Sequence, residues 1–241
     1  KSTTHRLIND LMELGYVEQD PNKKYYLSYE FLRIGNKIMN KNNFIEKMIP
    51  YMNFLVKKYN FDVALSAFYK KNVINLHTVY SGLSFGLIIT SGSIQPAYCT
   101  ATGKVFLANL SNEQLDKYLL KINLIPFTEY TIIDKNRLIE EVNITRINGF
   151  GAVNSEFIQD LCCIALPLRD TFNRVIGTMN FSTTSDKYGV LTNKEFIQEV
   201  KDVLSDVIDV WDIENIVYLF INEKVWIKNM IMKTFTLFYK E

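Results

Sequence analysis

The sequence KSTTHRLINDLMELGYVEQDPNKKYYL, residues 1–27, predicts the structure of the amino-terminal part of the chain. Its apolar residues recur at helical spacing, at Leu7, Ile8, Leu11 and Leu14. Gly15 follows and favours the left-handed conformation that is common just after a helix. Residues 16–27 form two strand-like runs around the turn sequence Asp20-Pro21-Asn22-Lys23, which predicts a β-hairpin. A helix followed by such a hairpin is typical of the reading helix and wing of a winged helix-turn-helix. We therefore expect a partial module of this kind over residues 1–28.

Hydrogen-bond donors gather at the start of this helix and at the tip of the hairpin. Such side chains suit contacts to base edges and phosphates, and His5 suits a phosphate better than a base. The candidate DNA-binding residues are Lys1, Ser2, Thr3, Thr4, His5, Arg6, Lys23 and Lys24. The pattern alone leaves an alternative open, which is an ordinary amphipathic helix followed by a solvated lysine turn. On the first interpretation the partner is double-stranded DNA.

Composition narrows the class of protein. The 241 residues allow one large domain beside a small module, and 48% hydrophobic residues suffice for a core. A net charge of +1 means that any nucleic-acid contact must come from a local patch. The three cysteines, Cys99, Cys162 and Cys163, lack a zinc-ligand spacing, so we expect no metal and a reducing, cytoplasmic location. No apolar run approaches the ~18 residues of a membrane span, so no membrane partner is expected.

Two helices are expected between the hairpin and the larger domain. Residues 29–42 predict a linker helix whose apolar residues are Phe31, Leu32, Ile34 and Ile38. This face either pairs two subunits or packs on its own domain, because an apolar stripe needs a partner surface. A second helix is expected from about Phe44 to Tyr59, with a kink or a late start at Pro50.

From Asp62 onward, alternating segments predict a sheet. The expected strands are 63–69, 73–80, 86–90, 151–155, 163–169 and 175–182. The expected helices are 98–110, one starting at the cap Ser111, one from Asp134 to about 148, and 192–212 with Thr192 as its cap. Because the outer strand groups are hairpins, the fold class is α+β, with an antiparallel sheet flanked by helices over residues 43–212. Residues 213–241 are expected to be an apolar extension that packs on this domain or on a neighbouring subunit.

Both halves of the chain resemble IclR-type transcription regulators. Residues 1–35 resemble the family's K-S-T-x-H-R-L-L and L-x-x-L-G-Y-V-E segments. Pro96–Ala108 resembles P-x-H-x-T-A-x-G-K-A-L-L-A of the GAF-like effector-binding domain, Arg146–Phe150 matches R-x-x-G-Y, and Cys163–Leu168 matches C-x-A-x-P followed by an apolar residue. The resemblance extends to about Asp212. It implies a DNA-binding repressor or activator that forms a homodimer or homotetramer and uses no cofactor. The family has a helix pair before the reading helix, so the resemblance also implies that the chain as given binds DNA poorly alone.

The resemblance also implies a pocket for a small-molecule effector. Carried over residue by residue, it nominates Tyr98, Ala101, Thr102, Asn154, Cys163, Asn180 and Ser182. Free N–H groups at a helix start favour a carboxylate, so we expect a small organic acid. Tyr98 stands where the family has histidine and Asn180 where it has serine, while Val153 and Asn154 replace an acidic pair that precedes the retained Glu156. The pocket should therefore be less acidic. The structural alternative stays open, since Ala-Thr-Gly also permits close packing and a buried cysteine is usually inert.

Two other functions need weighing. An enzyme built on Cys162–Cys163 is disfavoured, because His5 and His77 are the two histidines and no G-x-S-x-G or glycine-rich phosphate loop occurs. A sensing and oligomerisation module that does not itself bind DNA remains the alternative.

Overall fold

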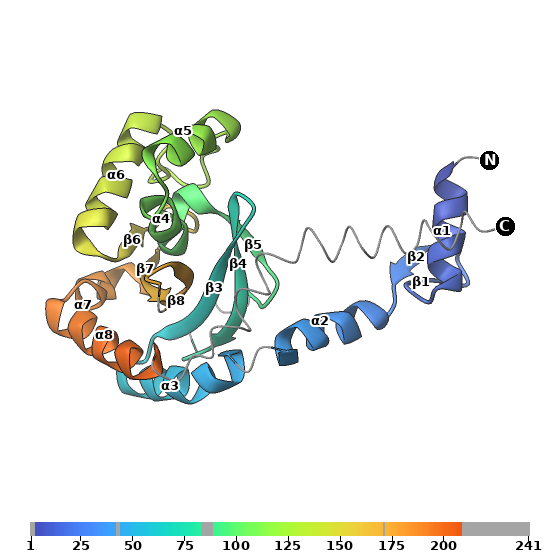
Figure 1. Cartoon of the computed structure of the whole chain (residues 1–241), viewed down its shortest axis with the longest axis horizontal. Coiled ribbons are helices and arrows are strands. Elements are labelled where there is room, and N and C mark those ends of the chain that lie inside the picture. Colours follow the sequence, from blue (N-terminus) through green and yellow to red (C-terminus); the bar gives the residue numbers. More distant parts are fainter. Residues whose placement is uncertain (1–2, 42–43, 83–88, 171, 209–241) are drawn as a thin grey trace. The chain divides into compact units, whose positions relative to one another are not determined.

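The computed structural model describes residues 3–41, 44–82, 89–170 and 172–208 (Figure 1). Contacts divide the chain into two compact units, residues 1–43 and 44–241, and each is considered by itself. Lys1, Ser2 and the apolar extension expected at 213–241 lie outside the described residues.

The first unit contains the expected helix and hairpin. Helix α1 spans Thr3–Glu13, strands β1 and β2 span Val17–Gln19 and Tyr25–Leu27, and helix α2 spans Glu30–Lys41. The end of α1 has the Schellman geometry, because Gly15 has a φ of +75° and the Gly15 and Tyr16 N–H groups donate to the carbonyls of Met12 and Leu11 at 3.0 and 2.9 Å. The helix, the hairpin and the second helix are thus present where the sequence predicts them.

Hydrogen bonds define the turn of the hairpin and its junction with α2. The Asp20 carboxylate accepts from the Lys24 N–H at 2.8 Å, which closes the turn that the sequence predicts. Ser28 donates to the Gly15 carbonyl, and its hydroxyl accepts from the Glu30 N–H at 3.2 Å, so it caps the start of α2.

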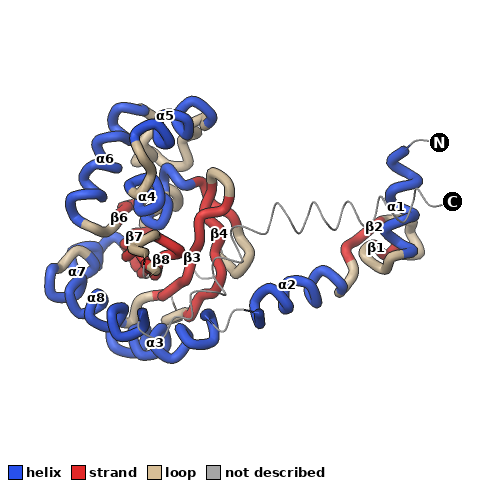
Figure 2. Tube along the Cα trace, viewed as in Figure 1, coloured by secondary structure: helices blue, strands red, loops and turns tan. Residues whose placement is uncertain are grey.

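The second unit is built on one antiparallel sheet of six strands, in the order β5-β4-β3-β8-β7-β6 (Figure 2). The strands are β3 Asp62–Tyr69, β4 Asn72–Val79, β5 Ile94–Pro96, β6 Gly151–Asn154, β7 Leu161–Arg169 and β8 Val175–Thr184. The α+β class and the antiparallel sheet are confirmed. The two central strands, β3 and β8, are the first and the last strand of this sheet in the sequence, so their pairing joins the half formed by β3 to β5 to the half formed by β6 to β8.

Helices cover both faces of this sheet. They are α3 Phe44–Tyr59, α4 Ala101–Ala108, α5 Asn112–Lys121, α6 Lys135–Asn148, α7 Tyr188–Leu191 and α8 Lys194–Ile208, with short 3-10 helices at Ala97–Cys99 and Ser185–Lys187. On β8, Phe181 packs against Phe196 of α8, with ring centroids 5.2 Å apart, whereas the Thr178 hydroxyl bonds that of Thr102 on α4 at 3.0 Å. Residues 178 and 181 point to opposite faces of a strand, so α4 and α8 lie on opposite faces of the sheet.

Four details differ from the sequence-based expectations. Ile89 and Thr90, the described part of the strand expected at 86–90, are not in a strand, and the third strand is β5 instead. The helix expected at 98–110 is broken at Thr100, whose extended backbone and hydroxyl cap α4. Helix α3 begins at Phe44 and contains Pro50, so the late start is wrong, while the kink stays a prediction. The cap of α8 is Asn193, which accepts from the Glu195 N–H at 2.8 Å, because the Thr192 hydroxyl donates to the Tyr188 carbonyl.

Candidate functional site

The start of α4 lies against neighbouring backbone. A Cβ on Gly103 would fall 1.9 Å from the Ala97 carbonyl oxygen, and a Cβ on Gly151 would fall 2.2 Å from the Ala101 carbonyl oxygen. Both positions therefore require glycine, and this supports close packing as one role of the Ala-Thr-Gly stretch. The Thr100 hydroxyl accepts from the Gly103 N–H at 3.2 Å. The amides of Ala101 and Thr102, in the first turn, have no acceptor within the helix.

A hollow opens beside this helix start, on the face of the sheet that α4 covers. Its lining consists of Val73, Ile89, Gln95, Cys99, Thr100, Ala101, Thr102, Val153, Phe157, Ile158, Leu161, Cys163 and Asn180. The cavity volume is about 30 Å³, which is room for one or two water molecules. A metabolite would therefore need the lining side chains to move apart. We call this hollow the effector pocket.

Four of the seven nominated effector residues line the effector pocket: Ala101, Thr102, Cys163 and Asn180. A fifth, Ser182, is adjacent, since its hydroxyl lies 3.3 Å from the Cys163 sulfur. The structure brings these five together from α4 and from the β7–β8 hairpin, which follows α4 much later in the sequence.

Tyr98 and Asn154 are not among the lining residues. The Tyr98 hydroxyl donates to the Ile125 carbonyl at 2.7 Å and accepts from the Ile125 N–H at 2.9 Å, so it ties a loop to the core. Asn154 is exposed, and its side-chain oxygen accepts from Ser155 and Cys162. Its neighbour Val153 takes the pocket-facing place on β6, because side chains alternate along a strand.

One polar side chain of the pocket has an unsatisfied hydrogen-bond acceptor. The Asn180 side-chain oxygen is buried and has no hydrogen-bond partner within the described structure. Such a group is costly to leave unpaired, by about 1–3 kcal/mol, and an incoming donor would relieve that cost. Burial raises the pKa of both Cys99 and Cys163 to about 12, so both lining cysteines are neutral thiols and not nucleophiles.

Sequence reasoning missed several lining residues. Gln95 belongs to β5, the strand that the pattern did not predict, and its amide donates to the Ser93 hydroxyl at 2.8 Å. Phe157 and Ile158 come from the loop between β6 and β7, where no periodic signal exists. Their apolar character in a loop was the available signal, since exposed loops are usually polar.

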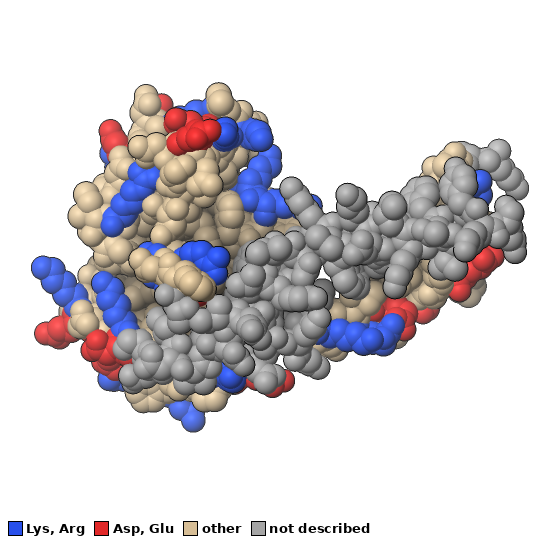
Figure 3. Space-filling view, viewed as in Figure 1, with Lys and Arg blue, Asp and Glu red and all other residues tan. Residues whose placement is uncertain are grey.

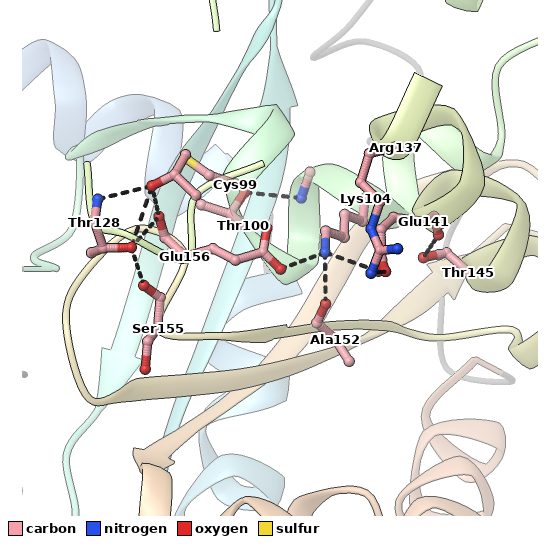
Figure 4. A network of polar contacts seen from close by, with 12 residues as sticks. Cys99, Thr100, Lys104, Thr128, Arg137, Glu141, Thr145, Ala152, Ser155 and Glu156 are labelled. Atoms are coloured by element: carbon pink, nitrogen blue, oxygen red, sulfur yellow. Dashed lines mark hydrogen bonds and ion pairs between the residues drawn. The ribbon is translucent and has the colours of Figure 1, made fainter. Parts of the chain in front are cut away.

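A buried ion pair anchors that loop (Figure 4). The Lys104 ammonium donates to Glu156 Oε1 at 2.6 Å, to Glu141 Oε2 at 3.2 Å and to the Ala152 carbonyl at 3.2 Å, and its side chain is only 1% exposed. Two threonines hold the backbone of the same loop: the Thr131 hydroxyl donates to the Glu156 carbonyl and the Thr128 hydroxyl to the Ser155 carbonyl, both at 2.6 Å. These bonds position Phe157 and Ile158 as a wall of the effector pocket.

The candidate DNA-binding side chains are open to contact. Thr3, Thr4, His5 and Arg6 on α1, and Lys23 and Lys24 at the hairpin turn, are all exposed. No residue of α1 is buried, and Leu7 is 58% exposed. On the face drawn in Figure 3, basic and acidic side chains both occur at several separate places, consistent with the near-neutral net charge.

Two family models match the chain, one over α1 and β1 and one over the larger unit. The family model described as the IclR helix-turn-helix domain matches residues 1–21, and that of the bacterial transcriptional regulator IclR C-terminal domain matches residues 36–208. The chain therefore belongs to the IclR family of bacterial transcriptional regulators. Members of this family are regulators and not enzymes, as the sequence predicts.

Individual relatives agree with this assignment. The HTH-type transcriptional regulator KdgR of Dickeya chrysanthemi is 26% identical over 198 residues, which are 82% of this chain and 65% of that protein. The structure of Thermotoga maritima IclR has a TM-score of 0.66 at 23% identity and covers 88% of this chain and 82% of its own. The structure of the inducer-binding domain of PobR from Acinetobacter, a double mutant in complex with 3-hydroxybenzoic acid, has a TM-score of 0.59 at 20% identity. The match covers 68% of this chain and 94% of that domain's chain.

The described part of the chain has neither a membrane-spanning helix nor a cluster of metal ligands. No described helix combines the length and the apolar character needed to cross a bilayer. Among the residues with described positions, no three His, Cys, Asp or Glu side chains group into a metal site.

Proposed function

We propose that this protein regulates transcription by binding duplex DNA through α1 and the hairpin, and that a small organic acid bound in the effector pocket controls it. Such a regulator would act in the cytoplasm, where bacterial DNA lies. The observation that carries it is the buried, unpartnered Asn180 side-chain oxygen in a pocket at the start of α4. A carboxylic acid in its protonated form, or a hydroxyl substituent, would donate to this oxygen, while the N–H groups of Ala101 and Thr102 would donate to a carboxylate.

A matched pair of variants tests the effector site. Asn180 and Asn154 are both nominated asparagines, but only Asn180 lines the pocket. The first probe is 3-hydroxybenzoate, the compound found with the PobR domain, followed by benzoate and short aliphatic acids, with binding measured by calorimetry. We expect Asn180→Ala to weaken binding by about ten-fold and Asn154→Ala to leave it unchanged. Equal effects of the two substitutions would contradict the assignment of the pocket.

The DNA contacts require a separate experiment. Binding of a random duplex is measured at about 50 and 200 mM salt, both for this chain and for the chain extended by the two helices that the family resemblance places before α1. Lys23→Gln combined with Lys24→Gln should weaken binding and reduce the slope of log K against log salt by about 2, or about 1 per lost phosphate contact. Binding that does not respond to salt would favour the alternative function, a sensing and oligomerisation module that does not itself bind DNA.

We place a homodimer contact on the apolar face of α2. Phe31 and Leu32 are 44% and 60% exposed, which is unusual for large apolar side chains on an amphipathic helix. Leu32→Glu should lower the mass measured by light scattering, whereas Asn36→Glu on the same helix should not. A mass unaffected by Leu32→Glu would move the subunit contact elsewhere.

A further inference from the structure

A second hollow lies at the opposite end of α4 from the effector pocket. The effector pocket touches Thr100 to Thr102 at the start of the helix, whereas the second hollow touches Ala108 and Asn109 at its end. The two share no lining residue. The second hollow has a volume of about 100 Å³, several times the ~10–15 Å³ that one ordered water requires. We call it the arginine pocket, because Arg146 of α6 and Arg169 of β7 both line it.

Arg169 has a free hydrogen-bonding edge. Its Nη1 donates to the Asn109 side-chain oxygen at 3.1 Å and to the Asn173 carbonyl at 2.9 Å. Its Nε and Nη2 have no partner among the described residues, and these two nitrogens form one side of the guanidinium fork. No described carboxylate lies within ion-pair distance of Arg169. The carboxylate of the next residue, Asp170, pairs with Arg174 at 2.6 Å instead. Burial lowers the pKa of Arg169, as expected for a partly buried cation without a counter-charge.

Arg146 contributes charge but few free donors. Its Nε and Nη2 donate to the carbonyls of Ala108 and Leu110, both at 2.9 Å, and its Nη1 donates to the Asn143 side chain at 2.9 Å. It thus caps the end of α4 and offsets the negative end of the helix dipole, which would otherwise repel an anion. The hollow combines two guanidinium charges with one unused bidentate edge.

We propose that the arginine pocket binds a small oxyanion, the phosphate or carboxylate group of a metabolite, with Arg169 as its anchor. A guanidinium edge matches two oxygens of such a group, and the paired bonds are charge-assisted. An oxyanion supplies the counter-charge that the described residues do not provide at this point. The site is distinct from the effector pocket, so it does not depend on the proposed effector.

NMR signals of the arginine side chains test this proposal directly. The full 241-residue chain is titrated with inorganic phosphate and, separately, with acetate, while chloride keeps the ionic strength constant, and the Nε–Hε signals of the arginines are recorded by NMR. We expect a saturable shift of the Arg169 signal, and the tighter of the two anions identifies the class of ligand. The wild-type signal decides the question even if a substitution impairs folding.

Variants then locate the site. Arg169→Gln should weaken anion binding by at least about ten-fold, and Arg169→Lys, which keeps the charge but loses the fork, should also weaken it. Arg137→Gln is the matched control, an exposed arginine on the same helix as Arg146, and it should leave affinity unchanged. The proposal is overturned if the Arg169 signal shows no saturable shift up to about 50 mM of either anion, beyond the range of weak millimolar binding. Equal weakening by Arg169→Gln and Arg137→Gln would overturn it too.

Discussion

The Lys104 ammonium and the Glu156 carboxylate form an ion pair at 2.6 Å inside the second unit, with side chains 1% and 9% exposed. The two residues are 52 positions apart, and the pair joins α4 to the loop that walls the effector pocket. Burial raises the pKa of Glu156, and the nearby Lys104 charge opposes that shift. The pair therefore links the stability of the domain to the shape of the pocket.

Breaking this pair should be costly. Lys104→Met leaves the Glu156 carboxylate buried without its cation, so we expect the free energy of unfolding to fall by about 3–5 kcal/mol. Urea denaturation at neutral pH measures this. Glu140→Gln is the control, because it removes an ion pair between two exposed side chains, Glu140 and Arg137, which lie 3.7 Å apart. Loss of this exposed pair should lower the free energy of unfolding by less than about 1 kcal/mol. Similar losses for both variants would show that the buried pair has no special role.

Gly103 should not tolerate a methyl group. The added Cβ of Gly103→Ala would lie 1.9 Å from the Ala97 carbonyl oxygen, a backbone atom that cannot move without shifting the start of α4. We expect a loss of about 1–3 kcal/mol or more in stability, together with weaker effector binding. Gly189→Ala, in α7 with nothing within 4 Å of the added Cβ, should change stability little. A fully stable Gly103→Ala protein would refute the close approach.

His77 should make the protein less stable in mild acid. Burial lowers the pKa of His77, whose partner across the hairpin is Leu65. Below the ordinary histidine pKa of about 6.5, the unfolded chain gains a proton that the folded protein does not yet bind, so stability falls as the pH is lowered through this range. His77→Gln should flatten that part of the curve of unfolding free energy against pH. Identical curves for the two proteins between pH 7 and the onset of carboxylate titration would contradict this.

The cysteines should be slow to react. With the pKa of Cys99 and Cys163 raised to about 12 by burial, almost no thiolate exists at pH 8. We expect reaction with a disulfide reagent to be at least about a hundred-fold slower than for a free thiol, and to become fast in urea. A bound effector should slow Cys163 further, because Cys163 lines the pocket. Rapid labelling of the native protein would argue against the neutral, buried thiols described above.

Much of the fold was predictable because its signals are local. The end of α1 at Gly15, the hairpin turn at Asp20, and the caps Ser111 and Asp134 each depend on residues within four positions, and all are present in the structure. One of the errors came from a competition between neighbouring residues. Thr192 and Asn193 can both cap a helix, and the backbone carbonyls nearby decided in favour of Asn193.

By itself, the sequence determined the family, the element types and four of the residues that line the effector pocket, since these depend on short motifs and on periodicity. Tertiary structure alone decided that β3 pairs with β8, that Asn180 faces the pocket while Asn154 turns away, and that Lys104 meets Glu156. It also placed Arg146 and Arg169 around one hollow. These outcomes join residues tens of positions apart, and the free energy of burying charges and polar groups depends on which partners the whole fold brings within reach.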